Sequence, residues 1–285
     1  MIIRKLGDKK PKILIFQGSP RDKDTCANME SKTHKVVEYM ISKWSPFINF
    51  NVIDLSVNQS KRPIIQPCKG CVSTAGGYHC HFECSCYFKG DDKKPDLLKE
   101  LDVYNLLQEC DAFIIVSPIH WHSLSAQVKT LFDRLVCVNQ TLTIDDAKKL
   151  MGDGNIKNSD ITGKFAKSGK YNDMLRNHLE GKVAGFYVHG DDGANDYTGK
   201  ELPDSYSDVL DDGFSNNPKS VVMPFVMQLK YSGVYVPDNL IQSFYINKGV
   251  DYYTANKTMN KEKEFFERAD MLLNNLLDYL DQSKS

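Results

Sequence analysis

The chain has 285 residues, of which 41% are hydrophobic and 26% charged, enough for one large core or two smaller ones, and this excludes disorder of the whole chain. With 36 basic and 37 acidic residues the formal net charge is -1, so no overall field draws the chain to nucleic acid or acidic lipid. The first residues offer only about five apolar positions in a row, and nothing approaches the roughly 20 needed to cross a bilayer. We therefore expect a cytoplasmic protein without nucleic-acid or membrane partners, its eight cysteines in a reducing compartment.

Short apolar runs alternate with amphipathic patterns along the chain. The apolar runs predict strands at 12–17, 49–55, 111–116, 182–189 and 232–237, and the helical spacings predict helices after Ser31 and at about 95–109, 124–138 and 254–281. The alternation indicates α/β architecture: a doubly wound parallel sheet of about five strands with helices on both faces. We expect a single domain over 1–285, with a Cys-rich loop at 67–88 and polar insertions at 139–181 and 194–218.

Two loops after predicted strands have residues suited to a ligand. Gly18 to Arg21 follows the first strand, and Ser31-Lys32-Thr33 begins the next helix, so hydroxyls, cations and helical N–H groups are available for a phosphate. An ordinary polar loop with a capping serine explains the same residues. The second loop, 117–123, contains Trp121 and two histidines, which suit a flat heteroaromatic ring; alternatively, Trp121 fills a gap. Because both loops follow parallel strands, they are expected to meet at the switch point of the sheet.

These residues carry a family resemblance. The runs ILIFQGSPR, SKTHKVVEYM and FIIVSPIHWHSLSAQVKTLFDR resemble the NADPH-dependent FMN reductases of the flavodoxin-like superfamily, well over 12–138 and more loosely over 182–280. The resemblance implies an FMN site in which the first loop binds the phosphate, the second lies against the isoalloxazine, and the loop after the fourth strand flanks the ring. The implied residues are Ser19, Arg21, Ser31, Lys32, Thr33, Pro118, Ile119, His120, Trp121, His122, His189, Gly190 and Asp191.

The sequence departs from the family pattern in two places. Residues 22–30 intervene between the arginine and the threonine of the phosphate loop, where the family loop is much shorter. His120 stands where the family commonly has tyrosine. A histidine beside a flavin would add a pH-dependent contribution to the redox step.

The segment 67–88 is dense in potential metal ligands. Cys68, Cys71, Cys80, Cys84 and Cys86 lie within about twenty residues, together with two histidines. Such a cluster suits an iron–sulfur centre, and iron–sulfur flavoproteins that resemble this fold have a compact Cys motif at about this place in the chain. The same residues also suit a structural zinc site, or they are thiols that bind no metal. Cys110 and Cys137 lie on helical patterns and are expected in the core.

Taken with the resemblance, these features predict an enzyme that passes electrons from NADH or NADPH through FMN to a quinone, a flavin, an iron complex or a similar small acceptor. The flavin supplies the redox chemistry, so no catalytic side chain is assigned. The alternatives are a flavodoxin-like electron carrier without enzymatic activity, possibly with a metal centre, and a metal-dependent interaction module without FMN. The resemblance also implies a homo-oligomer.

Overall fold

The computed structural model describes a large part of the chain. The described residues are 10–21, 28–56, 65–70, 80–84, 86–89, 94–143, 145–146, 173–191, 218–246, 254, 257–258 and 262–282. The predicted insertions at 139–181 and 194–218 lie mainly outside these residues. Among the helices of the described part, none is long and apolar enough to cross a membrane.

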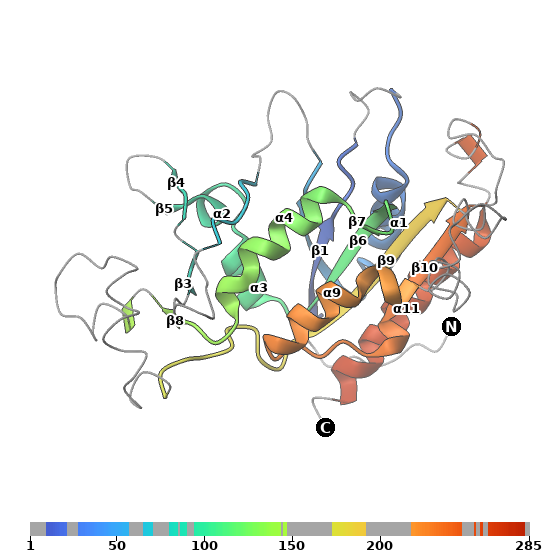
Figure 1. The fold of residues 1–285 in the computed structure, drawn as a ribbon. Coiled ribbons are helices and arrows are strands. Elements are labelled where there is room, and N and C mark those ends of the chain that lie inside the picture. The colour runs from blue at the N-terminus through green and yellow to red at the C-terminus, as the bar shows by residue number, and fades with distance from the viewer. Residues whose placement is uncertain are drawn as a thin grey trace, which may run out of the picture.

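Five parallel strands form the central sheet (Figure 1). They are β1 (Lys12–Gln17), β2 (Asn49–Asp54), β6 (Ala112–His120), β9 (Val183–Asp191) and β10 (Ile241–Ile246). Their order is β10-β9-β6-β1-β2, which is 2-1-3-4-5 when the five are counted along the chain. This is the flavodoxin-like order, and the predicted doubly wound sheet is confirmed.

Each face of the sheet is covered by helices (Figure 1). On one face, Ile13 and Ile15 of β1 pack in a core with α1 (Lys32–Trp44) and α11 (Lys263–Gln282). On the other face, Leu14 and Phe16 pack in a core with α3 (Val103–Glu109), α4 (Ala126–Arg134) and α9 (Pro218–Tyr231). Alternate β1 side chains thus enter opposite cores, which explains why its sequence reads as a continuous apolar run.

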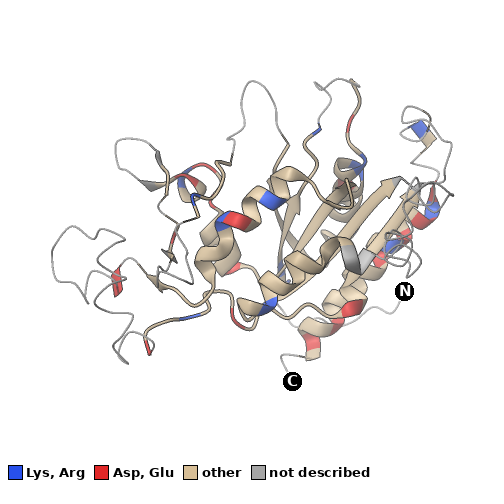
Figure 2. Cartoon of the chain, viewed as in Figure 1, with Lys and Arg blue, Asp and Glu red and all other residues tan. Residues whose placement is uncertain are grey.

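Charged residues lie mainly outside the sheet. Figure 2 shows the strands almost free of acidic and basic positions, which lie instead on the helices and loops. Burial of the central strands agrees with this distribution, because residues 112–117 of β6 are all buried. A clear exception is the buried Arg134 at the end of α4.

Short elements from the Cys-rich segment lie to one side of the sheet (Figure 1). β3 (His81–Phe82) pairs with β8 (Leu142–Thr143), and β4 (Phe88–Lys89) pairs with β5 (Lys94–Pro95), which leads into α2 (Asp96–Lys99). The ring of Phe82 stacks on His178 with centroids 4.2 Å apart. These contacts attach the segment to the α4 side of the core.

Several predicted boundaries were wrong. The helix expected at 95–109 is two helices, α2 and α3, separated at Asp102, whose φ of 53° ends helical geometry. The helix expected at 124–138 is α4 followed by a 3-10 turn, Leu135–Val138. The strand expected at 232–237 makes a single bridge between Tyr235 and Val183, and the fifth strand is β10, after another 3-10 turn at Asp238–Leu240. The terminal helix expected at 254–281 is interrupted at Glu262: the described residues 254 and 257–258 are helical, and α11 begins at Lys263.

Candidate functional site

The predicted switch point lies between β1 and β6, and it is tightly packed at Gly18. The Gly18 amide donates to the Val116 carbonyl of β6 over 2.7 Å, and the Ser125 hydroxyl at the start of α4 donates to the Gly18 carbonyl. A Cβ at Gly18 would lie 2.4 Å from Cγ2 of Val128. The position therefore requires glycine, and the loop that follows starts from a fixed point at the carboxyl edge.

The first loop is ordered by its own side chains. The Ser19 amide donates to Oε1 of Gln17 over 2.7 Å, and the Arg21 amide donates to Oγ of Ser19 over 3.1 Å. Ser31 is the N-cap of α1, and its Oγ accepts from the His34 amide over 3.0 Å. The first turn of α1 contains no acidic residue, so its positive dipole end faces this edge uncompensated by carboxylates of its own turn.

A second contact joins this loop region to β9. Oγ1 of Thr33 and Nε2 of His189 are hydrogen-bonded at 2.7 Å, although the two residues are 156 positions apart. Burial, together with the positive charges of Lys32 and His120, lowers the pKa of His189 to about 3. The pKa of His120 is itself lowered by burial and then by the charge of Arg21. Arg21 is thus close enough to influence His120, and Lys32 and His120 are close enough to influence His189, so two cations, Arg21 and Lys32, lie near this edge.

The second loop is a tight hairpin. β6 runs to His120, turns through Trp121 and His122, and pairs with β7 (Ser123–Leu124). Trp121 and His122 have φ of 49° and 60°, the pattern of a two-residue turn with both central residues left-handed. The side chain of Trp121 is 91% exposed, so it does not fill a gap in the core.

The third predicted loop adjoins the second. His189 of β9 is the strand partner of Pro118, and a Cβ at Gly190 would lie 3.3 Å from Cβ of Ile119. Asp191 ends β9. The structure thus brings Ser19, Arg21, the start of α1, the 118–122 hairpin and the end of β9 to one edge of the sheet.

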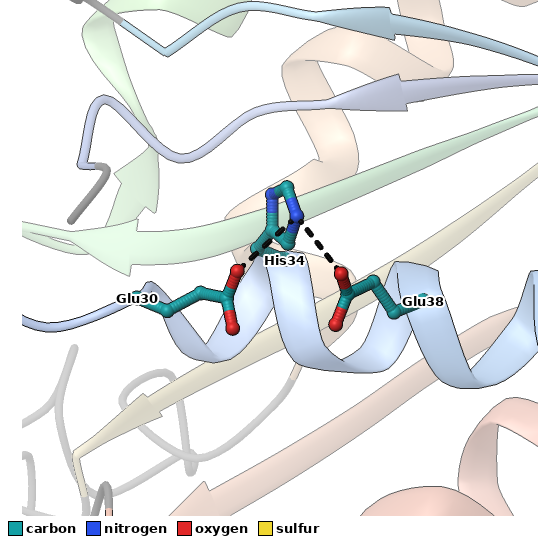
Figure 3. Close-up of side chains that lie close together, drawn as sticks. All are labelled: Glu30, His34 and Glu38. Carbon is teal, nitrogen blue, oxygen red and sulfur yellow. Dashed lines mark ion pairs between the residues drawn. The ribbon is translucent and has the colours of Figure 1, made fainter.

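One charged cluster near this edge was not predicted. Glu30 lies just before α1, and His34 and Glu38 lie on it, with Nε2 of His34 at 3.3 Å from Glu30 Oε1 and 3.4 Å from Glu38 Oε1 (Figure 3). In the described part of the chain it is the single group of three potential metal ligands with adjacent ligand atoms. Its side chains are 36–62% exposed, as in a ladder of surface ion pairs, and the E-x3-H-x3-E spacing was the signal for it.

The predicted metal site is not supported among the described residues. Cys71 lies outside them, and Cys68, Cys80, Cys84 and Cys86 form no group of three ligand atoms within 4.8 Å of one another. Cys84 is instead buried at 2% exposure and accepts a hydrogen bond from Nε of Arg134 over 3.3 Å. Cys110 and Cys137 are buried in the core, as predicted.

Arg134 organises this segment, a role that no sequence pattern indicated. Its guanidinium forms two hydrogen bonds with the Asp96 carboxylate, of 2.6 and 3.1 Å, and both side chains are buried. It also donates to the Gln66 carbonyl over 3.1 Å and lies 4.9 Å from the ring centroid of Tyr87. An arginine in the last turn of a helix is ordinarily solvated. The local sequence around Arg134 therefore did not predict its burial or its partners, which are distant in the sequence.

The order of the strands and the two loops at the carboxyl edge together identify the fold. A parallel sheet in 2-1-3-4-5 order, with Gly18–Arg21 and the 117–123 hairpin at its switch point, is that of a flavodoxin-like α/β protein. Residues 11–152 match the model of the family described as NADPH-dependent FMN reductase, and over this part the chain belongs to that family, which is one of oxidoreductases.

Solved structures with similar folds were also found. The general stress protein 14 of Treponema denticola, in complex with FMN, is 14% identical, with 96% of this chain and 99% of that chain covered and a TM-score of 0.42. The NAD(P)H:quinone oxidoreductase of Methanothermobacter marburgensis is 12% identical (92% and 98% covered, TM-score 0.46), and the azoreductase of Bacillus anthracis str. Sterne is 12% identical (95% and 99%, 0.42). A search of curated protein sequences gave no match.

Proposed function

We propose that this chain binds FMN at the switch point between β1 and β6 and passes electrons from NADPH or NADH to a small acceptor, such as a quinone, a free flavin or an iron complex. The observation that carries the proposal is the 2.7 Å hydrogen bond that joins Thr33 at the start of α1 to His189 at the end of β9, with Lys32 close enough for its charge to act on His189. A phosphate monoester has close to two negative charges, and helical N–H groups, hydroxyls and fixed cations are what stabilise it.

The phosphate would be held by the first loop and the start of α1. The cations are Arg21 and Lys32, and the hydroxyls are those of Ser19, Ser31 and Thr33. His189 stays neutral at pH 7 because its pKa is about 3, so it contributes a hydrogen bond to Thr33 rather than a charge. Its role would be to orient the threonine hydroxyl.

The flavin ring would lie against the hairpin that follows β6. Pro118, Ile119 and His120 form the end of the strand, while Trp121 and His122 at the turn offer ring surfaces that are exposed in the described structure. His189, Gly190 and Asp191 at the end of β9 would flank the ring from the next strand. When bound, the flavin supplies hydride acceptance from the nicotinamide and electron delivery to the acceptor. The residues named here hold and orient it, and the approach of Gly190 to Ile119 keeps the two strand ends together.

The test is a fluorescence titration of the flavin-free protein with FMN and with riboflavin, which lacks the phosphate. We expect FMN to bind more tightly than riboflavin, and Arg21→Glu to weaken FMN binding by several kcal/mol, on the order of 100-fold or more in Kd, while riboflavin binding changes little. Lys230→Glu is the matched control. Lys230 is in the last turn of α9. The chain after α9 passes Gly233, whose carbonyl accepts from the Gly181 amide just before β9 begins. Lys230 is therefore at the edge of the sheet opposite the proposed phosphate site. Equal FMN affinity in the wild type and Arg21→Glu would contradict the proposed phosphate site.

A further inference from the structure

The surroundings of Cys84 differ from those of the other buried cysteines. Nε of Arg134 donates to its Sγ over 3.3 Å, and the guanidinium is held in that direction by Asp96 and by the Gln66 carbonyl. Because a guanidinium only donates, the sulfur is the acceptor in this hydrogen bond. A sulfur that accepts from a fixed cation is stabilised as the thiolate, the nucleophilic form.

Cys80 lies beside Cys84 and completes the arrangement. The two side chains are close enough to act on each other electrostatically, and neither thiol is part of a disulfide bond. The neighbouring Cys80 thiol, the Cys86 amide and the Arg134 guanidinium all lower the pKa of Cys84. Because Arg134 donates to Cys84, the thiolate is assigned to Cys84 and the remaining proton to Cys80, which is the partly exposed member of the pair.

Two cysteines of the same chain show what buried thiols without this arrangement look like. Burial raises the pKa of Cys110 to about 11 and that of Cys137 to about 12. Each of these sulfurs hydrogen-bonds an uncharged oxygen, the Leu107 carbonyl for Cys110 and the Tyr104 hydroxyl for Cys137. Cys84 instead accepts a hydrogen bond from the Arg134 guanidinium, so we expect Cys110 and Cys137 to be unreactive by comparison.

We propose that Cys80 and Cys84 form a redox-active dithiol that is oxidised by small hydroperoxides. The Cys84 thiolate attacks one peroxide oxygen, the O–O bond breaks, and hydroxide or an alkoxide leaves with one oxygen while Cys84 becomes a sulfenic acid. The Cys80 sulfur then displaces the sulfenic oxygen and its proton completes a water molecule. The two thiols lose two electrons, the peroxide gains them, and a disulfide joins residues 80 and 84.

Because the two sulfurs lie close together, we expect disulfide formation, the second step, to be faster than the oxidation of Cys84 by peroxide. A sulfenic acid formed on Cys84 has a thiol already beside it, so the disulfide forms before further oxidation. The small size of a hydroperoxide matters because Cys84 is 2% exposed and the pair is reached from the Cys80 side. The inference concerns a site apart from the flavin loops and does not depend on FMN binding.

The experiment uses the full-length protein, reduced, desalted and treated with hydrogen peroxide in the absence of nicotinamide. Remaining thiols are alkylated after denaturation, and the protein is digested after glutamate, because Glu83 separates the two cysteines. We expect the Cys80 and Cys84 peptides to be joined by a disulfide, two hydrogens lighter than the sum of the reduced peptides, and both to escape alkylation. Cys110 should stay fully alkylated.

Variants distinguish the roles of the two thiols. In Cys80→Ser, peroxide should take Cys84 to the sulfinic and sulfonic acids, because the resolving thiol is gone. In Cys84→Ser, peroxide should be consumed at least about tenfold more slowly, and Cys80 should remain alkylatable. Cys110→Ser is the matched control and should form the 80–84 disulfide as the wild type does. Circular dichroism of each variant checks that it is folded.

Three results would overturn the proposal. The first is full alkylation of Cys84 after peroxide treatment of the folded wild type. The second is a disulfide from Cys84 to Cys68 or Cys86 in place of Cys80. The third is stoichiometric iron or zinc that is released when Cys80 and Cys84 are alkylated, which would assign the thiols to a metal.

Discussion

Replacing His189 tests the buried connection between β9 and the start of α1. His189 is 5% exposed, and its Nε2 is hydrogen-bonded to Thr33 Oγ1 at 2.7 Å. Burial and the charges of Lys32 and His120 lower its pKa in the folded protein. In an unfolded chain the same imidazole is solvated and protonates near its ordinary pKa of about 6.5. The folded state therefore binds fewer protons than the unfolded state, and stability falls as the pH is lowered from about 6.5 towards 3.

The size of the effect follows from the two pKa values. With a pKa of about 3 in the folded protein and about 6.5 in the unfolded chain, His189 costs about 2 kcal/mol of unfolding free energy between pH 7 and pH 5. The glutamine side chain of the His189→Gln variant cannot titrate in this range, yet its amide can replace the hydrogen bond to Thr33. The variant should therefore lose about 2 kcal/mol less than the wild type over this interval.

The assay is urea unfolding of the flavin-free protein at pH 7 and pH 5, followed by circular dichroism. Other titrating groups are common to both proteins and cancel in the comparison. His122→Gln, which removes a histidine from the exposed turn next to the site, is the control for loss of a histidine. An equal loss of unfolding free energy in the wild type and His189→Gln between the two pH values would show that His189 does not have a lowered pKa in the folded protein.

Two further predictions concern packing and charge. Gly18→Ala should lower the unfolding free energy by about 1–3 kcal/mol, because the added Cβ would lie 2.4 Å from Val128 Cγ2. Adding Val128→Ala to this variant should recover part of the loss. If urea unfolding shows that the losses of the two substitutions are strictly additive, the contact is not the cause. Arg134→Met leaves the buried carboxylate of Asp96 without its cation and should lower the unfolding free energy by about 3–5 kcal/mol. Adding Asp96→Asn should recover part of this loss. A loss below about 1 kcal/mol for Arg134→Met would show that the pair is not buried in solution.

The sheet could be predicted because its central strands are buried on both faces. β1, β6 and β9 each contain an apolar run that identifies the strand, although β6 and β9 continue beyond the run, to His120 and Asp191. The fifth strand was missed because β10 is an edge strand that contains Gln242 and Ser243, whereas the more apolar 232–237 makes only one bridge. Pairing at an edge depends on the neighbouring strand rather than on the segment's own apolar content.

Part of the candidate site was also predictable. The family resemblance implied Thr33 and His189 at one FMN site, and the structure joins the two side chains by a hydrogen bond. The ion pair of Arg134 with Asp96 could not be foreseen, since nothing in the local pattern of either residue distinguishes a buried charge from a solvated one. The same holds for Cys84, whose environment is created by Arg134 fifty positions away.

The proposed flavin chemistry is tested most directly by the absorbance spectrum of the anaerobic protein reconstituted with FMN, before and after addition of NADPH. We expect bound flavin with bands at roughly 370 and 450 nm that bleach when NADPH is added and return when a quinone is added afterwards. Bound flavin that NADPH leaves oxidised would indicate an electron carrier reduced by another protein. A protein that does not take up FMN at all would contradict the proposed site.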